Sequence, residues 1–328
     1  EDYRYQSSIT LGLNENFLIY AKTIQSHLNV ENIALLDIGS NDGSFIQACR
    51  KEGIRAYGIE PSKEIAALAT LHDCPTLNSY FSQETSTLFS DVNFPLEYDI
   101  ITFNNVLANL PSPIESLKIA NSLLKDSNSF ICIQTGYHPK QFAKGLFDYI
   151  YHEHYSYFNI SSMYALACQC GLYIHKIEEL DLRGGSIRFI LKKGKSTIKY
   201  THERFTSLYE LNGLYELISA SSNHLNATID KLKTEGNIIA GYGASHSTGI
   251  LVHHFQLASK LDFLVDENKK KQGLFMPGTD LLVYRPECIN LHNKSFVVVV
   301  LAWQYFEQIR RKLIQSGFTG MIIKPVLP

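Results

Sequence analysis

Short apolar stretches alternate with amphipathic ones along the first half of the chain. Apolar side chains recur at helical spacing over residues 14–28, and a compact apolar run of strand length follows at 33–38. The alternation then continues, with strands expected at 56–60, 99–103 and 129–134 and helices at 65–71 and 114–124. Strands and helices in this order build a parallel sheet that is covered on both faces. We therefore predict an α/β fold with a doubly wound, Rossmann-like first domain.

The second half of the chain starts with a different pattern and then repeats the first one. It is predicted to contain two antiparallel strands, a long helix with a leucine stripe, a strand with a glycine turn and two further strands, at 174–179, 186–192, 202–235, 237–245, 261–265 and 296–302. Because 328 residues exceed the roughly 100–200 residues of one domain, we expect two domains. The first is placed at 1–200, and a linker helix with a second Rossmann-like domain is placed at 201–328.

The segment Asp37-Ile38-Gly39-Ser40-Asn41-Asp42-Gly43-Ser44 joins the first strand to the next helix and is the most informative part of the sequence. Its glycines allow positive φ and a close approach of the backbone to a ligand, and the helix that follows offers unpaired N–H groups. Glu60 ends the next strand, near the offset of about 20 residues at which an acid binds ribose hydroxyls. This pattern predicts a nucleoside-binding turn, with a plain tight turn as the alternative.

The loop favours S-adenosylmethionine over a dinucleotide as the cofactor. A dinucleotide loop has three glycines and places a pyrophosphate on the helix terminus, where Asp42 would repel it. S-adenosylmethionine carries a cationic sulfonium and no phosphate, so an acidic, amide-rich loop suits it. A class I methyltransferase is therefore favoured over a nicotinamide-dependent oxidoreductase. The residues expected to bind the cofactor are Gly39, Ser40, Asn41, Gly43, Glu60, Asn104 and Asn105. For the two amides at the end of the third strand, an Asx turn is the alternative.

A second candidate site is the segment 147–158, which is dense in titratable and aromatic groups. His152 or His154 could remove a proton near neutral pH, and Glu153 could orient or polarise a partner. The tyrosines, Tyr151 among them, supply hydrogen-bond donors for a developing oxyanion. A metal chelate and buried, hydrogen-bonded histidines are the alternatives. The six cysteines lack paired C-x-x-C spacing, so we predict no metal.

The second glycine turn, Gly241-Tyr242-Gly243, opens another helix. The hydroxyls of Ser245, Ser247 and Thr248 could bind phosphate oxygens there, although a simple tight turn is an equally good interpretation.

Composition limits the partners of this chain. A formal net charge of −2 provides no field that attracts nucleic acid, so a small molecule is the expected partner. No apolar run approaches the roughly 20 residues that cross a bilayer, and no basic-then-apolar secretion signal is evident. We therefore expect a cytoplasmic protein without a membrane partner. The sequence carries no heptad seam and leaves the oligomeric state open.

The ordered set of motifs resembles one family, the nucleotide-sugar C-methyltransferases, which methylate a dTDP-linked keto-deoxysugar on carbon. In the first two thirds of the chain the resemblance is carried by Tyr3-Arg4-Tyr5-Gln6-Ser7-Ser8, the Asp37–Ser44 loop, Asn104-Asn105-Val106, residues 151–158 and Gly184-Gly185-Ser186-Ile187-Arg188. In the last third it is carried by Gly241-Tyr242-Gly243-Ala244, Val265-Asp266, Lys271-Gln272-Gly273, Pro277-Gly278-Thr279 and Ala302-Trp303.

The resemblance implies a methyltransferase domain followed by a Rossmann-like domain, with the sugar nucleotide between them. It implies that His154 removes the proton beside the ketone, that Tyr151 and Glu153 bind and polarise the substrate, and that Tyr5 reaches in from the N-terminal segment. The residues expected to complete the substrate site are His152, Tyr242, Gly243, Ser245 and Ser247.

The chain departs from the family pattern at three places. The family usually opens with a cysteine-rich zinc module, and none precedes Tyr3 in this sequence. Asn109 stands where a histidine is usual, and an amide cannot shuttle a proton near pH 7. Gln134-Thr135-Gly136-Tyr137 stands where an acid-containing strand end is expected. Two alternatives therefore stay open: methylation of oxygen or nitrogen in a sugar or other metabolite, and a non-catalytic relative that binds a nucleotide-sugar.

Overall fold

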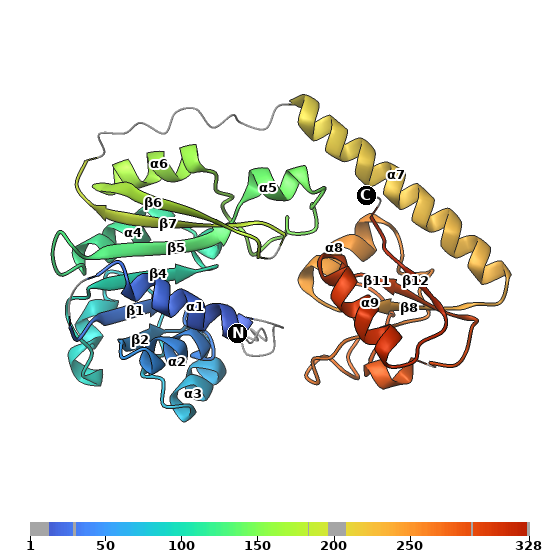
Figure 1. Cartoon of the computed structure of the whole chain (residues 1–328), viewed down its shortest axis with the longest axis horizontal. Helices are drawn as coiled ribbons and strands as arrows, with labels where there is room; N and C mark the ends of the chain where they lie inside the picture. Colours follow the sequence, from blue (N-terminus) through green and yellow to red (C-terminus); the bar gives the residue numbers. More distant parts are fainter. Residues whose placement is uncertain (1–12, 29–30, 183, 196–207, 290, 327–328) are drawn as a thin grey trace. The chain divides into compact units, whose positions relative to one another are not determined.

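A computed structural model of the chain describes residues 13–28, 31–182, 184–195, 208–289 and 291–326. The chain forms two compact units (Figure 1). The first consists of Glu1–Lys140 and Glu153–Arg204, and the second of Gln141–His152 and Phe205–Pro328. The helix α5 (His138–Ala143) spans the point where the chain first passes from one unit to the other. The described residues contain no helix that is both long and apolar enough to cross a bilayer.

The first unit contains a seven-stranded sheet in the order β3-β2-β1-β4-β5-β7-β6. The strands are β1 (Ala34–Ile38), β2 (Arg55–Ile59), β3 (Thr76–Leu77), β4 (Ile100–Asn104), β5 (Phe130–Gly136), β6 (Leu172–Leu180) and β7 (Ser186–Lys193). The first five are parallel, and β7 runs antiparallel to both β5 and β6. The strand order reverses between β1 and β4, which is where open α/β sheets bind ligands. The predicted doubly wound sheet and its antiparallel pair are confirmed.

Helices cover both faces of this sheet because its strands are apolar on both sides. They are α1 (Leu13–Gln25), α2 (Ser44–Lys51), α3 (Lys63–Leu71), α4 (Pro113–Ser122) and α6 (Ile160–Gln169), with short 3-10 turns η2 (Thr85–Leu88), η3 (Ser90–Val92) and η4 (Leu107–Asn109). Leu35 and Ile100 pack with α1 and α2, whereas Leu36 and Ile101 pack with α4 and α6. On the first of these faces Tyr20 stacks on Phe45, with ring centroids 4.7 Å apart. Alternate residues of each strand thus enter two separate cores.

The second unit is built on a five-stranded parallel sheet in the order β10-β9-β8-β11-β12. Its elements are α7 (Leu208–Thr234), β8 (Ile238–Tyr242), α8 (His246–His254), β9 (Phe263–Val265), β10 (Val283–Tyr284), η5 (Pro286–Cys288), β11 (Phe296–Val300), η6 (Trp303–Tyr305), α9 (Phe306–Gln315) and β12 (Met321–Ile323). This order reverses between β8 and β11, so the unit has a Rossmann-like sheet of its own. The sequence pattern had not indicated β10, α9 or β12, which are short or lie outside an apolar run.

A short segment of the first half of the chain belongs to the second unit. Leu146, Phe147 and Tyr149 are buried in the core that α7, β8 and β11 form. Between them, the buried carboxylate of Asp148 accepts a hydrogen bond of 3.0 Å from the indole N–H of Trp303. The chain passes between the units three times, and the division expected at residue 200 lies near the last of these crossings. The first two arise because residues 141–152 contribute apolar side chains to the core of the second unit.

We predict that Trp303→Phe destabilises the second unit in a pH-dependent manner. Burial raises the pKa of Asp148 to about 6, so the carboxyl is neutral at pH 5 and ionised at pH 8. The stability that the neutral Asp148 carboxyl contributes to the fold is lost as pH rises through this pKa. The variant also removes the indole N–H of Trp303, a hydrogen-bond donor that the ionised carboxylate needs. Urea unfolding should show a loss of about 1–3 kcal/mol at pH 8 and a smaller loss at pH 5. Tyr284→Phe, on an exposed ring, is the control; equal losses at the two pH values contradict the prediction.

Candidate functional site

The loop between β1 and α2 is held against β2 by its own backbone. The N–H groups of Gly39 and Ser40 both donate to the carbonyl of Ile59, at 2.8 and 3.0 Å. Gly39 has φ of 68°, and a Cβ added there would lie 2.7 Å from Cγ2 of Val106. Gly43 has φ of 78°, and its Cβ would lie 2.7 Å from Cβ of Cys74. Both positions therefore require glycine, for the left-handed backbone and for the close packing.

Two of the loop's neighbouring acids are engaged by backbone N–H groups. Glu60 is buried, and its carboxylate accepts hydrogen bonds from the N–H of Asn41 at 3.1 Å and of Ser62 at 2.8 Å. Burial raises the pKa of Glu60. Asp42 accepts from the N–H and the hydroxyl of Ser44, at 3.2 and 2.6 Å, at the start of α2. A carboxylate thus lies at the helix terminus that a pyrophosphate would use, in line with the argument against a dinucleotide.

A third acid, Asp37, was missing from the predicted site residues. Its side chain is only 2% exposed, and its carboxylate accepts hydrogen bonds from the Thr102 hydroxyl at 2.6 Å and the Asn104 amide at 3.0 Å. Burial, and to a smaller extent the nearby charge of Glu60, raise its pKa to about 7 against the opposing effect of these two donors. The signal that could have found it is the ionisable residue inside an otherwise apolar strand.

The amide pair at the end of β4 lies beside this acid. Asn104 gives its amide N–H to Asp37, so its Oδ1 is buried with no hydrogen-bond partner in the described part of the chain. The hydroxyl oxygen of Ser40 is buried in the same unpartnered way. Asn105 adopts a positive φ of 56°, and its N–H donates to the carbonyl of Gln134 at 2.8 Å. Unsatisfied buried acceptors next to a glycine loop are what a ligand with hydroxyl and amino donors would complete.

The histidine segment is joined to the same end of the sheet. The N–H groups of Tyr155 and Ser156 donate to the carbonyl of Ala108, at 2.8 and 3.1 Å. Ala108 lies in η4, two residues after the Val106 that closes over Gly39. The half-buried ring of His154 lies 5.7 Å from that of Tyr157, measured between centroids. These two hydrogen bonds therefore hold the backbone that follows His154 near the glycine loop.

The predicted catalytic cluster is divided between the two units. Glu153 and His154 belong to the first unit, whereas Tyr151 and His152 belong to the second. The rings of Tyr151 and His152 lie 5.8 and 6.4 Å from that of His246, at the start of α8. Sequence proximity had grouped these four residues, three as catalytic and His152 as substrate-binding. Tyr5, the fourth predicted catalytic position, lies outside the described residues.

The second glycine turn packs tightly against Ala302, the residue that follows β11 and Leu301. Gly243 has φ of 111°, and a Cβ there would lie 2.9 Å from Cβ of Ala302. The Ser245 hydroxyl caps α8 by accepting from the N–H of Thr248 at 3.3 Å and lies 2.9 Å from the Ser247 hydroxyl. The ring of Tyr242 is buried, and its hydroxyl donates to Glu267 at 2.8 Å. Of the predicted substrate residues here, the two serines present their hydroxyls at a helix start, while Tyr242 points into the protein.

Comparison with known proteins identifies the chemistry. Residues 15–177 match the family described as methyltransferase domain, and residues 181–326 match the C-methyltransferase C-terminal domain. The chain is 25% identical over 324 residues to the C-methyltransferase NovU of Streptomyces niveus, covering 91% of this chain and 75% of that protein. It is 22% identical over 167 residues to a ubiquinone biosynthesis O-methyltransferase of Hydrogenovibrio crunogenus, covering 48% of this chain and 69% of the relative. A crystal structure of an S-adenosylmethionine-dependent methyltransferase from Archaeoglobus fulgidus covers 55% of this chain and 94% of its own, with 17% identity and a TM-score of 0.45.

These matches agree with the fit of S-adenosylmethionine to the first unit, and S-adenosylmethionine is the cofactor. Glu60, which the sequence predicts to bind the ribose hydroxyls, is buried beside the glycine loop. The hydroxyl of Ser40 and the Oδ1 of Asn104 are buried without a hydrogen-bond partner in the described residues, and the carboxylate of Asp37 lies next to Asn104. The described residues show no group of three or more His, Cys, Asp or Glu arranged to hold a metal ion.

We predict that cofactor binding releases a proton from Asp37. A cation beside this carboxyl lowers its pKa from about 7, so binding should tighten as pH rises. The affinity should increase up to about tenfold per pH unit between pH 5 and 7 and level off above pH 7. Calorimetry in buffers of different ionisation enthalpy measures both the affinity for the cofactor and the number of protons released on binding. Asp37→Asn should abolish the slope; a slope that persists in this variant assigns the proton to another group, such as Glu60.

Proposed function

We propose that this S-adenosylmethionine-dependent methyltransferase transfers the methyl group to a carbon atom beside the ketone of a nucleotide-linked keto-deoxysugar. The observation that carries the proposal is the attachment of the His154 segment to η4, directly beside the cofactor loop. Such a placement brings an imidazole, the side chain most often used as a general base, to the side of the sheet where the methyl donor is proposed to bind. The similarity to a C-methyltransferase over most of the chain supports carbon as the acceptor atom.

In the proposed reaction, the imidazole of His154 takes the proton from the carbon next to the ketone. The electron pair left behind spreads onto the ketone oxygen, to which the Tyr151 hydroxyl can donate a hydrogen bond, while Glu153 binds and polarises the substrate. When bound, the cofactor would supply an electrophilic methyl group. Its transfer to the deprotonated carbon would break the carbon–sulfur bond and leave the electron pair on the sulfur of S-adenosylhomocysteine, while His154 holds the abstracted proton. Alignment by the protein accounts for most of what methyl transfer itself requires.

Asn109 and the second unit have separate proposed roles. The Oδ1 of Asn109 is buried and has no hydrogen-bond partner in the described residues. It can therefore accept a hydrogen bond from a sugar hydroxyl, although it cannot exchange a proton near pH 7. Gly243, Ser245 and Ser247 form a helix start that suits phosphate oxygens of the nucleotide, with His152 next to it in the proposed substrate site. We propose that the protein works in the cytoplasm on this small molecule.

Methylation of oxygen is the second candidate. The matches to ubiquinone O-methyltransferases favour it, but they cover about half of this chain or less. They are too short to span both the methyltransferase domain at 15–177 and the C-methyltransferase C-terminal domain at 181–326.

We predict that His154→Gln slows proton exchange at the carbon beside the ketone. The probe is dTDP-4-keto-6-deoxy-D-glucose in D₂O with the protein saturated with S-adenosylhomocysteine, followed by proton NMR. The wild-type protein should exchange this position, and the variant should be at least about 100-fold slower because it lacks the base. Cofactor affinity should stay unchanged.

The matched control is His72→Gln, at an exposed histidine after α3. Equal exchange rates in the wild type and His154→Gln would refute the base assignment. A product whose new methyl group resonates as O-methyl would select the second candidate instead.

A further inference from the structure

A row of polar side chains crosses the sheet of the first unit near the carboxyl ends of its parallel strands. Asn104 of β4 is in register with Gln134 of β5, Gln134 with Arg188 of β7, and Arg188 with Glu178 of β6. Residues paired directly across strands point to the same face of a sheet. The row therefore connects the cofactor loop, through Asn104 and its bond to Asp37, with the antiparallel edge of the unit.

Arg188 is the fixed centre of this row. Its guanidinium donates to Gln134 Oε1 at 2.8 Å and to Glu178 Oε2 at 3.0 Å. Its Cζ lies 3.6 Å from the centre of the Tyr20 ring, and its side chain is 7% exposed. The Tyr20 hydroxyl is held in turn by a contact of 3.1 Å to the sulfur of Cys132. Arg188 is thus placed by three side chains from three elements.

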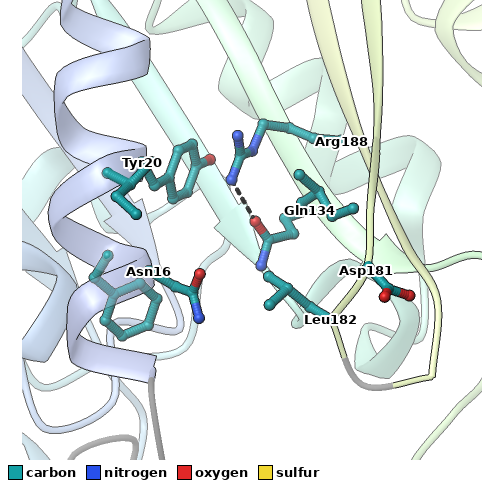
Figure 2. Close-up of a pocket in the computed structure, with 9 residues that line it drawn as sticks. Asn16, Tyr20, Gln134, Asp181, Leu182 and Arg188 are labelled. Carbon is teal, nitrogen blue, oxygen red and sulfur yellow. Dashed lines mark hydrogen bonds between the residues drawn. The ribbon is translucent and has the colours of Figure 1, made fainter.

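The arginine decides which way the Gln134 carboxamide faces. A guanidinium has only donors, so the carboxamide oxygen must point to Arg188 and the NH₂ group must point away from it. Figure 2 shows this arrangement, with the amide nitrogen directed toward Leu182 and Asn16. Among the described residues, no side chain or carbonyl accepts a hydrogen bond from this nitrogen. A buried residue therefore presents an oriented donor that the protein itself leaves unused.

This donor lies in the wall of a cavity of about 290 Å³. The cavity is lined by α1, β5, β7 and the end of β6, including Asn16, Tyr20, Gln134, Asp181, Leu182 and Arg188 (Figure 2). Its volume is at the lower end of the roughly 300–1,000 Å³ of small-molecule sites, which suits one sugar ring better than a whole nucleotide-sugar. Glu178 pairs with Arg188 at 3.0 Å and with Lys176 at 2.7 Å. Because the Arg188 guanidinium is already engaged by Glu178 and Gln134, a ligand oxygen that accepts from the Gln134 amide fits this wall.

We propose that Gln134 binds the methyl acceptor, by donating its Nε2–H to a hydroxyl or carbonyl oxygen of the deoxysugar ring in this cavity. Arg188 is then a positioning residue, which acts through the orientation that it imposes on Gln134. The inference rests on the proposed function and extends it, because it assigns the sugar subsite to the edge between α1 and β7. The register of Gln134 with Asn104 places this subsite one strand away from the cofactor-binding strand β4.

The variant that tests the inference is Gln134→Glu. Glutamate keeps the shape of the side chain and accepts the hydrogen bond from Arg188, but it has no N–H to donate when ionised. Calorimetry on protein saturated with S-adenosylhomocysteine, titrated with dTDP-4-keto-6-deoxy-D-glucose, should show affinity weakened by about tenfold or more. The affinity for S-adenosylmethionine and the thermal midpoint should not fall, because both the cofactor loop and the Arg188 contacts are retained.

The positioning role of Arg188 has its own readout. Arg188→Met should lower the thermal midpoint and, in protein assayed well below that midpoint, weaken sugar binding to a similar extent as Gln134→Glu. The double variant should lose little further affinity, because both changes remove the same hydrogen bond. Losses that multiply in the double variant would show that Arg188 contributes only to the fold and would overturn its assignment.

Two negative outcomes have different meanings. If the wild-type protein and Gln134→Glu bind the keto-sugar nucleotide equally, the Gln134 inference is wrong while the proposed function stands. If the wild-type protein binds S-adenosylmethionine but does not bind the keto-sugar nucleotide, the proposed substrate is wrong and the sugar subsite is overturned with it.

Discussion

The join between β1 and β4 is the constraint on which the first unit depends. At this join the carboxylate of Asp37 takes hydrogen bonds from Thr102 and Asn104, both on the strand that pairs with its own. A buried carboxyl is costly unless its oxygens are satisfied, so these bonds fix how the two strand ends meet. The strand order also reverses here, which is where open α/β sheets bind ligands. The raised pKa of Asp37 and the start of the polar row at Asn104 both depend on this contact.

Both units use the same device to hold a glycine turn. In the first, Glu60 after β2 accepts the N–H of Asn41; in the second, Asp266 after β9 accepts the N–H of Ala244 at 2.8 Å. The shared device explains why the two turns look alike in sequence. They differ in their surroundings, because the first has unsatisfied buried acceptors nearby, whereas the second has serine hydroxyls paired with one another at a helix start. The ligand of such a turn therefore cannot be assigned from the turn alone, because it depends on the residues that surround the turn.

The polar row extends from the parallel part of the sheet to its antiparallel edge. Strands β6 and β7 add antiparallel partners to a parallel sheet, and their contribution is Glu178 and Arg188 rather than apolar side chains alone. Since arginine cannot accept a hydrogen bond, each contact in the row has only one possible direction at Arg188. The hydrogen bond from Arg188 thereby fixes which end of the Gln134 carboxamide is oxygen and which is the NH₂ donor. Carbon methylation with this sugar subsite is a proposal that brings these observations together.

The hydrophobic pattern was sufficient to predict most elements of both sheets, because the periods of buried strands and amphipathic helices are local properties of the chain. The glycines and Glu60 were found for the same reason, since the loop and its acid lie within one strand–helix–strand unit. The tertiary structure alone decided the raised pKa of Asp37 and the row from Asn104 to Glu178. The hydrogen-bonded partners are far apart in the sequence: Asp37 and Asn104 are separated by 67 residues, and Gln134 and Arg188 by 54. It also separated Tyr151 and His152 from their sequence neighbours, because apolar side chains just before them are buried in another core. Sequence spacing carries no information on which core a side chain enters, or on which distant group satisfies a buried charge.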